Sequence, residues 1–207
     1  GRRRRGRRSR RRRREEEKET LTLTALHMNV RGWRSKQESV LKVIDQTNPQ
    51  YVNLNETQLR GDNKVSMKYF SCFNKNREKA AGGGICSAVS KDLKSHAVCV
   101  GEGEEEDEWI CVRFDHVSPC LTIVNCYGEQ EGRSSKEEVV ARWGRLRKEL
   151  AKIRSRGDSC LLIGDINKLV GTGRLGVPGN HPEVSPGGHL VRDLVQSGDW
   201  VLINSME

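Results

Sequence analysis

The stretch Cys160-Leu161-Leu162-Ile163-Gly164-Asp165-Ile166-Asn167-Lys168 is the starting point for predicting the fold. A short apolar run that ends in a glycine is typical of a strand buried on both faces. Gly164 allows the backbone to turn, or to approach a ligand closely, at the end of that strand. Asp165 and Asn167 are two positions apart, so both side chains can leave the strand end in the same direction. Taken alone, the pattern favours an Asx turn that closes a buried strand, and only the rest of the chain favours a functional site.

The chain has 207 residues and a formal net charge of +9, which suits one domain with a sizeable core. Eleven of the first fourteen residues are Arg, and the remaining 26 basic residues are balanced by 28 acidic ones. The body is therefore close to neutral, so any binding of polyanions by the folded part must depend on local sites or on a metal. Residues 1–19 are Arg-rich and then acidic, and we expect them to be disordered. They fit a nuclear-targeting or nucleic-acid-binding arm and, equally, a low-complexity leader with no dedicated role.

Seven cysteines show no CxxC pair and no regular ligand spacing. This pattern favours small buried residues in a reducing compartment over a zinc site or a disulfide framework. No apolar run approaches the roughly 20 residues that span a bilayer. We therefore expect an intracellular protein without a membrane segment, and the Arg tail makes the nucleus the expected compartment.

Hydrophobic periodicity predicts alternating strands and helices. Two capping boxes, Ser35 with Glu38 and Ser135 with Glu138, predict the starts of two helices that end before Asn48 and near Gly157. A third, short helix is predicted around 190–195. The predicted strands are 21–28, 51–55, 85–89, 109–114, 121–127, the run before Asp165, and 200–203.

Three further segments have a simple structural interpretation. The glycines Gly82–Gly84 could form a phosphate-binding loop, but no Lys-Ser/Thr pair follows them as in a P-loop. A flexible segment that leads into a β-hairpin is therefore favoured. The acidic run Glu104–Glu108 is predicted to be a solvated loop. Residues 171–188 are rich in Gly and Pro and are predicted to form a loop. Trp143 belongs to the apolar stripe of the predicted helix after Ser135, so it is expected in the core.

Polar side chains stand at the carboxyl ends of the predicted strands, where sites gather in layered α/β folds. They are Asn29, Glu56, Tyr127, Asp165 and Asn167. Mg²⁺ prefers oxygen ligands and keeps several waters, so one carboxylate and one amide are a sufficient protein contribution. A second carboxylate can activate a water, while an amide and a phenol can donate hydrogen bonds to a phosphate. The set therefore fits metal-assisted phosphodiester hydrolysis.

Ordered motifs over residues 21–170 resemble the endonuclease/exonuclease/phosphatase superfamily, which includes deoxyribonuclease I-like enzymes. Within it, they are most similar to the endonuclease domain of non-LTR (LINE-type) retrotransposons. The matching segments are Met28-Asn29-Val30-Arg31-Gly32, Leu54-Asn55-Glu56-Thr57-Gln58-Leu59, Gly82 to Ser90, Leu121 to Tyr127, and Gly164-Asp165-Ile166-Asn167.

The resemblance implies an α/β (α+β) fold, a four-layer sandwich of two packed β-sheets flanked by helices. It also implies a Mg²⁺ site, with Mn²⁺ as the alternative ion, where Glu56 is the carboxylate ligand and Asn29 lies beside it. Asp165 would orient or activate the water. Asn167 would hold the phosphate, Tyr127 would contact the scissile phosphate, and the substrate would be DNA.

Two departures from the family pattern are visible. Gly128-Glu129 follows Tyr127, where the family usually has a proline two residues after the tyrosine. The domain, assigned to residues 20–207, also lacks the family's final Ser-Asp-His segment. We therefore expect a C-terminally incomplete sandwich, a fragment or a decayed copy, with little or no nuclease activity by itself.

Three functions remain open at this point. The first is a Mg²⁺-dependent, DNA-nicking endonuclease domain of a retrotransposon-type protein. The second is a non-catalytic remnant that binds nucleic acid through its Arg tail. The third is a superfamily phosphatase or phosphodiesterase that acts on small or lipid substrates.

Overall fold

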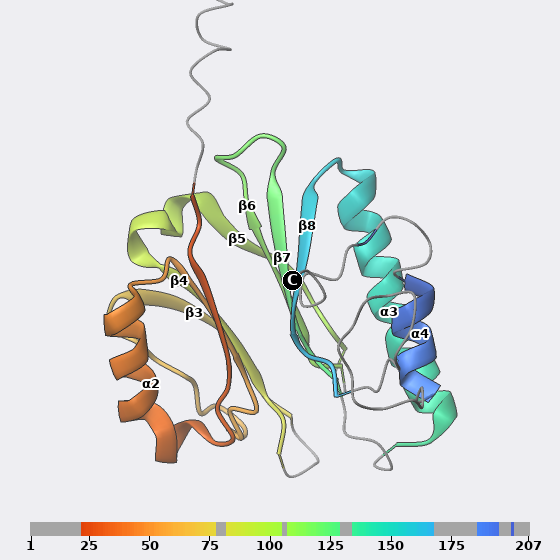
Figure 1. Cartoon of the computed structure of the whole chain (residues 1–207), viewed down its shortest axis with the longest axis horizontal. Coiled ribbons are helices and arrows are strands. Elements are labelled where there is room, and N and C mark those ends of the chain that lie inside the picture. Colours follow the sequence, from red (N-terminus) through yellow and green to blue (C-terminus); the bar gives the residue numbers. More distant parts are fainter. Residues whose placement is uncertain are drawn as a thin grey trace, which may run out of the picture.

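The computed structural model describes residues 22–77, 82–104, 107–128, 134–167, 186–194 and 200. Within these residues, two four-stranded sheets pack face to face, and helices cover their outer faces (Figure 1). The first sheet has the order β1 (Ala25–Asn29), β2 (Tyr51–Asn55), β4 (Ile85–Ser90), β3 (Phe70–Lys75). The second has the order β5 (Ala97–Glu102), β6 (Trp109–Phe114), β7 (Leu121–Tyr127), β8 (Ser159–Asp165). The predicted four-layer α+β sandwich is confirmed.

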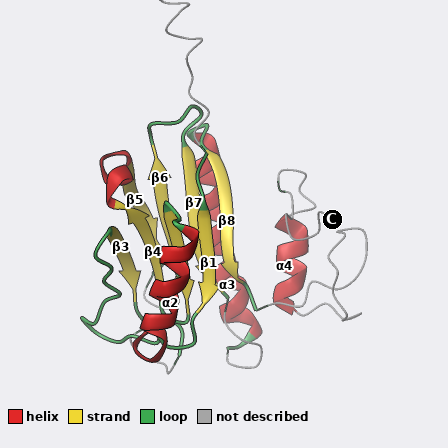
Figure 2. Cartoon of the chain, turned by 60° about the vertical axis from the view of Figure 1, so that its left-hand side comes forward, coloured by secondary structure: helices red, strands yellow, loops and turns green. Residues whose placement is uncertain are grey.

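Helices lie on opposite outer faces of the sandwich. Helix α2 (Trp33–Thr47) covers the first sheet, and Figure 2 shows it crossing the face of that sheet. Helices α3 (Lys136–Ser155) and α4 (Pro186–Leu194) lie outside the second sheet (Figure 1). A short 3₁₀ helix, η1 (Lys91–His96), connects β4 to β5.

Three apolar clusters separate these layers. The residues that pack α2 on the first sheet include Val40, Ile44, Val52 and Leu54. The cluster between the sheets includes Tyr51, Ile85, Ile110, Phe114 and Ile123. The third cluster, beneath α3 and α4, includes Cys111, Val124, Trp143, Leu146 and Val191. Burial of these residues supplies the main favourable free energy of folding, and the predicted core position of Trp143 is confirmed.

Strand direction determines which ends of the strands meet. Strand β1 runs parallel to β2, and β7 runs parallel to β8, with Tyr127 opposite Asp165 in the register. Parallel neighbours end at the same edge of a sheet. Each sheet therefore presents the carboxyl ends of two adjacent strands at one edge.

The two helix starts differ from each other. The predicted capping box of α3 is confirmed, because Ser135 Oγ accepts from the Glu138 N–H and Glu138 Oε2 accepts from the Ser135 N–H. The predicted box at Ser35 is wrong, since α2 begins earlier, at Trp33. The N–H groups of Gly32 and Trp33 donate instead to the Glu56 and Thr57 carbonyls, at 2.8 Å each. Tertiary contacts thus replace the side-chain cap.

Other sequence predictions also require correction. Strands β3 and β5 had not been predicted, because their segments show little alternation of apolar and polar residues. Strand β8 is only half-buried, since it is the outermost described strand of its sheet. All seven cysteines are free thiols, of which Cys86, Cys111 and Cys126 are buried as predicted and the other four are only partly buried. The Arg-rich tail, most of the 171–188 loop and the last predicted strand lie outside the described residues.

The acidic run before β6 is partly buried. Asp107 and Glu108 are buried, not solvated as predicted. Arg145 binds Asp107 with two hydrogen bonds of 2.6 Å, and Arg77 pairs with Glu108. These arginines, far away in the sequence, compensate the charges that burial would otherwise penalise. No helix in the described segments is both long and apolar enough to cross a membrane.

Candidate active site

A single amide connects the carboxyl ends of the two sheets. Asn29 Nδ2, at the end of β1, donates to Glu56 Oε1 at 2.9 Å and to Asp165 Oδ2 at 2.8 Å. Glu56 follows β2 in the first sheet, whereas Asp165 ends β8 in the second. The two carboxylates therefore share one donor nitrogen across the junction of the sheets.

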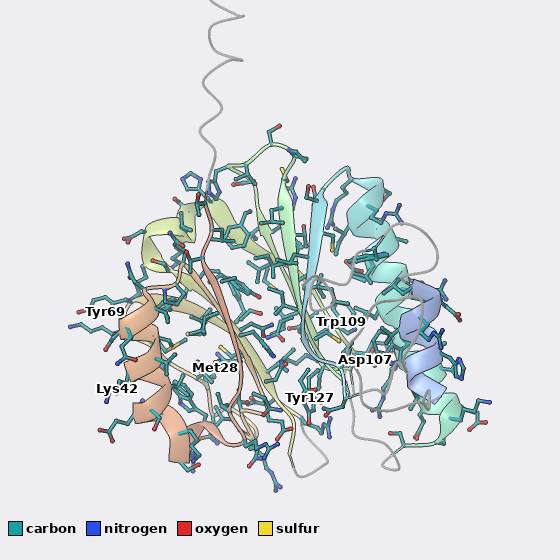
Figure 3. The ribbon with its side chains drawn as sticks, viewed as in Figure 1. Met28, Lys42, Tyr69, Asp107, Trp109 and Tyr127 are labelled. Atoms are coloured by element: carbon teal, nitrogen blue, oxygen red, sulfur yellow. The ribbon has the colours of Figure 1, made fainter. Side chains whose placement is uncertain are left out.

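The other two predicted side chains join the same network. The Tyr127 hydroxyl donates to Glu56 Oε1 at 2.7 Å, and Tyr127 lies near the lower junction of the sheets in Figure 3. The Asn167 N–H donates to Asp165 Oδ1 at 3.1 Å. Its side-chain Nδ2 donates to the Gly128 carbonyl at 2.8 Å. The structure thus brings all five residues singled out in the sequence into one hydrogen-bonded group.

Burial controls the protonation of the phenol in this group. It raises the pKa of Tyr127, and the hydrogen bond to the Glu56 carboxylate raises it further. Tyr127 is therefore a neutral hydrogen-bond donor throughout the physiological range. Burial also lowers the pKa of the nearby His27 imidazole, although the charge of Asp165 opposes that shift.

Two buried amides, which the sequence analysis had not singled out, position Asp165. Asn55 Oδ1 accepts from the Asp165 N–H at 2.8 Å, and Asn55 Nδ2 donates to Asn125 Oδ1 at 2.7 Å. Asn125 Nδ2 in turn donates to the Cys86 carbonyl at 3.1 Å. Asn55 and Asn125 are fully buried between the sheets. The sequence carried a signal for these two residues, because an amide within an otherwise apolar strand indicates a buried polar group that needs a hydrogen-bond partner.

The backbone around Glu56 is held in an unusual conformation. Glu56 and Gln58 have φ angles of 54°, in the left-handed region that non-glycine residues rarely adopt. The Thr57 N–H donates to the Gly84 carbonyl at 2.9 Å, and the Gln58 N–H donates to the Gly83 carbonyl at 2.8 Å. The segment Gly82–Gly84 therefore supports the loop that carries Glu56. The sequence analysis had predicted only a flexible segment before a hairpin there. Strain of this kind at a polar cluster favours a functional site.

Two glycines allow β7 and β8 to approach closely at the site. A Cβ atom on Gly164 would lie 1.7 Å from the Cys126 carbonyl oxygen, and one on Gly128 would lie 1.9 Å from the Ile166 carbonyl oxygen. The Gly128 N–H also donates to the Asp165 carbonyl at 2.8 Å. Gly128 directly precedes position 129, where the chain departs from the family pattern, and at Gly128 the absence of a side chain is what the local packing requires.

A buried ion pair supports the site from the β6 side. Arg77 pairs with Glu108, and their side chains are only 4% and 3% exposed. Glu108 also accepts from the Gly84 N–H, and its carbonyl accepts from the Tyr127 N–H at 2.8 Å. The pair thus connects the glycine segment to the strand that carries Tyr127. Figure 3 shows the preceding residue, Asp107, with Trp109 on the α3 side of the second sheet.

The donor set fits a magnesium ion. Two carboxylates that face the same amide create a local negative field, and Mg²⁺ is bound through one or two carboxylates and retained waters. Asn29 presents its Nδ2 to the carboxylates, while its Oδ1 accepts from the Arg31 N–H at 3.3 Å. A half-turn of this amide would exchange the two atoms and present an oxygen instead.

Comparison with known proteins gives fold similarity at low sequence identity. No protein-family model and no curated protein sequence matches the chain. Among solved structures, the AP endonuclease LMAP from Leishmania major superposes with a TM-score of 0.65 and 15% identity, over 84% of this chain and 66% of that protein. The 3′ phosphatase NExo from Neisseria, bound to a product DNA hairpin, gives 0.63 and 14%, over 84% and 71%.

A third structure is the endonuclease domain of TRAS1, a telomere-specific non-LTR retrotransposon. It gives a TM-score of 0.58 at 14% identity, over 86% of this chain and 71% of that one. The chain spans about two thirds of the length of the proteins it matches. The two-sheet sandwich and these superpositions agree with the resemblance found in the sequence motifs. The chain therefore has the fold of the endonuclease/exonuclease/phosphatase superfamily.

Proposed function

We propose that the chain is the endonuclease domain of a retrotransposon-type protein, a Mg²⁺-dependent phosphodiester hydrolase that nicks DNA and has little activity as this chain alone. The observation that supports this most directly is the Asn29 amide shared by Glu56 and Asp165. Fold similarity to an AP endonuclease, to a DNA-bound 3′ phosphatase and to a retrotransposon endonuclease domain is consistent with DNA as the substrate.

Each residue has a distinct role in this proposal. Glu56 holds the metal and Asn29 completes its protein ligands. When bound, the ion supplies charge that polarises the phosphoryl oxygen and stabilises the leaving alkoxide. The Asp165 carboxylate orients the attacking water and accepts its proton. Hydrogen bonds from the Asn167 N–H to Asp165 Oδ1, and from the Asp165 N–H to Asn55 Oδ1, hold this carboxylate in position.

Tyr127 and Asn167 bind the phosphate in this proposal. The neutral Tyr127 hydroxyl donates to Glu56 in the absence of substrate and can turn to a phosphate oxygen. Asn167 has a φ of 46°, which places its side chain next to the backbone of Gly128. Both donors lie beside the carboxylates before substrate arrives, and each exchanges its protein acceptor, Glu56 or the Gly128 carbonyl, for a phosphate oxygen.

Metal binding is the first test, because it does not depend on turnover. Mn²⁺ bound to the full chain is measured by electron paramagnetic resonance, with Mg²⁺ as the competitor. We expect Glu56→Gln to weaken binding at least tenfold, whereas Asp45→Asn, which removes an exposed carboxylate of α2, leaves it unchanged. Equal binding by Glu56→Gln and the parent chain would refute the proposed metal site.

Plasmid nicking is the second test. Supercoiled DNA is incubated with excess chain, so that slow turnover is visible, and conversion to open circles is followed with and without Mg²⁺. We expect any nicking to require Mg²⁺ and to fall at least a hundredfold in Asp165→Asn, but not in Asp45→Asn. Nicking that persists in Asp165→Asn would contradict the assignment of Asp165. Hydrolysis of inositol phosphates without nicking would replace DNA by a small substrate.

A further inference from the structure

We propose that His96, Asp115 and His116 form a second cation site, specific for a transition metal of the Zn²⁺ class. One ligand atom from each side chain can be chosen so that all three lie within 4.8 Å of one another. None of the three belongs to the group around Glu56 and Asp165. The proposed cation site is therefore separate from the proposed catalytic group.

The β5–β6 ladder brings these residues together. Helix η1 ends at His96, directly before β5, and Asp115 follows the last residue of β6. Ala97 pairs with Phe114, and the Asp115 N–H donates to the His96 carbonyl at 3.1 Å. Position 96 is thus held opposite position 115 by backbone hydrogen bonds, whatever the side chains do.

The side chains already face one another. His96 Nδ1 lies 4.0 Å from Asp115 Oδ1. The imidazole rings of His96 and His116 have centroids 4.7 Å apart and are tilted by 39°. Both ring nitrogens of His116 have almost no solvent-accessible surface, although the residue is partly exposed, and neither has a hydrogen-bond partner among the described residues. A shielded polar atom without a partner costs free energy, and a bound metal would supply the missing interaction for one of the two nitrogens.

The ligand types determine which metal is expected. Two imidazoles and one carboxylate suit Zn²⁺, Cu²⁺ or Ni²⁺, whereas Mg²⁺ prefers oxygen ligands alone. Three protein ligands leave the fourth tetrahedral position to a water. Tetrahedral Zn²⁺ with bonds of about 2.05 Å needs ligand atoms roughly 3.4 Å apart. The His96 and Asp115 side chains are 49% and 54% exposed, so small rotations can bring them to that separation.

The cluster is remote from the phosphate site. Phe114 pairs with Leu121 at the start of β7, whereas Tyr127 is at its end, about 20 Å away at 3.3 Å per residue. In Figure 1 the β6–β7 connection lies at the opposite end of the sheets from Tyr127, which Figure 3 labels in the same view. A metal here would join the start of β5 to the end of β6. Its expected consequence is stabilisation of the second sheet, not a part in hydrolysis.

Calorimetric titration tests the site directly. The full chain, without a polyhistidine tag and freed of metal by chelation, is titrated with Zn²⁺ in excess Mg²⁺, which saturates the oxygen-ligand site. We expect one Zn²⁺ per chain, with an affinity reduced at least tenfold in His96→Gln and in His116→Gln. The matched control is His189→Gln, which changes an exposed histidine of α4 and should leave the affinity unchanged.

Two further measurements identify the ligands and the effect of the ion. Co²⁺ in place of Zn²⁺ should give visible absorption without intense thiolate charge-transfer bands, because the proposed ligands include no cysteine. Zn²⁺ at a hundredfold excess over its Kd should raise Tm by about 5–10 °C, and the His96→Gln, His116→Gln double variant should lose this shift. Failure of the parent chain to bind Zn²⁺, equal binding by the double variant, or thiolate bands would each overturn the proposal.

Discussion

The buried amide pair between the sheets should be a major contributor to stability. Replacing Asn55 with Leu leaves the Asp165 N–H and Asn125 Oδ1 without their hydrogen-bond partners. Each buried group left unpaired costs about 1–3 kcal/mol, so Asn55→Leu should lower the free energy of unfolding by about 2–6 kcal/mol. That is a large part of the roughly 5–15 kcal/mol typical of a folded domain.

Urea-induced unfolding, followed by tryptophan fluorescence, measures this loss. Gln46→Leu is the control, because it replaces an exposed amide of α2, and its cost should stay within about 0.5 kcal/mol. A double-mutant cycle then isolates the amide pair. Asn55→Leu and Asn125→Leu both remove the same 2.7 Å hydrogen bond, so the double variant should cost about 1–3 kcal/mol less than the sum of the single variants. A cost below 1 kcal/mol for Asn55→Leu, or strict additivity, would refute this account.

Three further predictions concern other parts of the structure. Arg77→Met removes the Arg77–Glu108 ion pair from a buried site, where Glu108 still accepts from the Gly84 N–H, and should cost about 3–5 kcal/mol in urea unfolding, whereas the additional change Glu108→Leu should recover part of the loss. Because burial raises the pKa of Tyr127, the folded state retains a proton that the unfolded state loses above about pH 10. The free energy of unfolding should therefore fall as pH rises above that value, and less steeply in Tyr127→Phe; identical slopes between pH 8 and pH 11 would contradict this. Deleting residues 1–14, with their eleven arginines, should weaken DNA binding and flatten its dependence on salt, measured by fluorescence anisotropy at several salt concentrations, and an unchanged slope would exclude a contribution of the tail.

The sequence alone was sufficient for the local part of this description. Apolar alternation predicted most of the strands, and the box at Ser135 predicted the start of α3, because these signals depend on neighbouring residues only. The polar residues at strand ends were also visible, since an apolar run that ends in Asn, Asp or Tyr is a local pattern. What these residues would do was inferred from the order of the motifs.

Only the tertiary structure decided how these strand ends meet. Asn29 and Asp165 are 136 positions apart, and their contact depends on the packing of two separate sheets. The same packing explains the incorrect predictions. The N–H groups at the start of α2 donate to the Glu56 and Thr57 carbonyls, and the acidic run before β6 pairs with Arg77 and Arg145. Local periodicity fixes which face of a strand is apolar. The partner of a buried amide or carboxylate is chosen by long-range burial, which leaves no local signature.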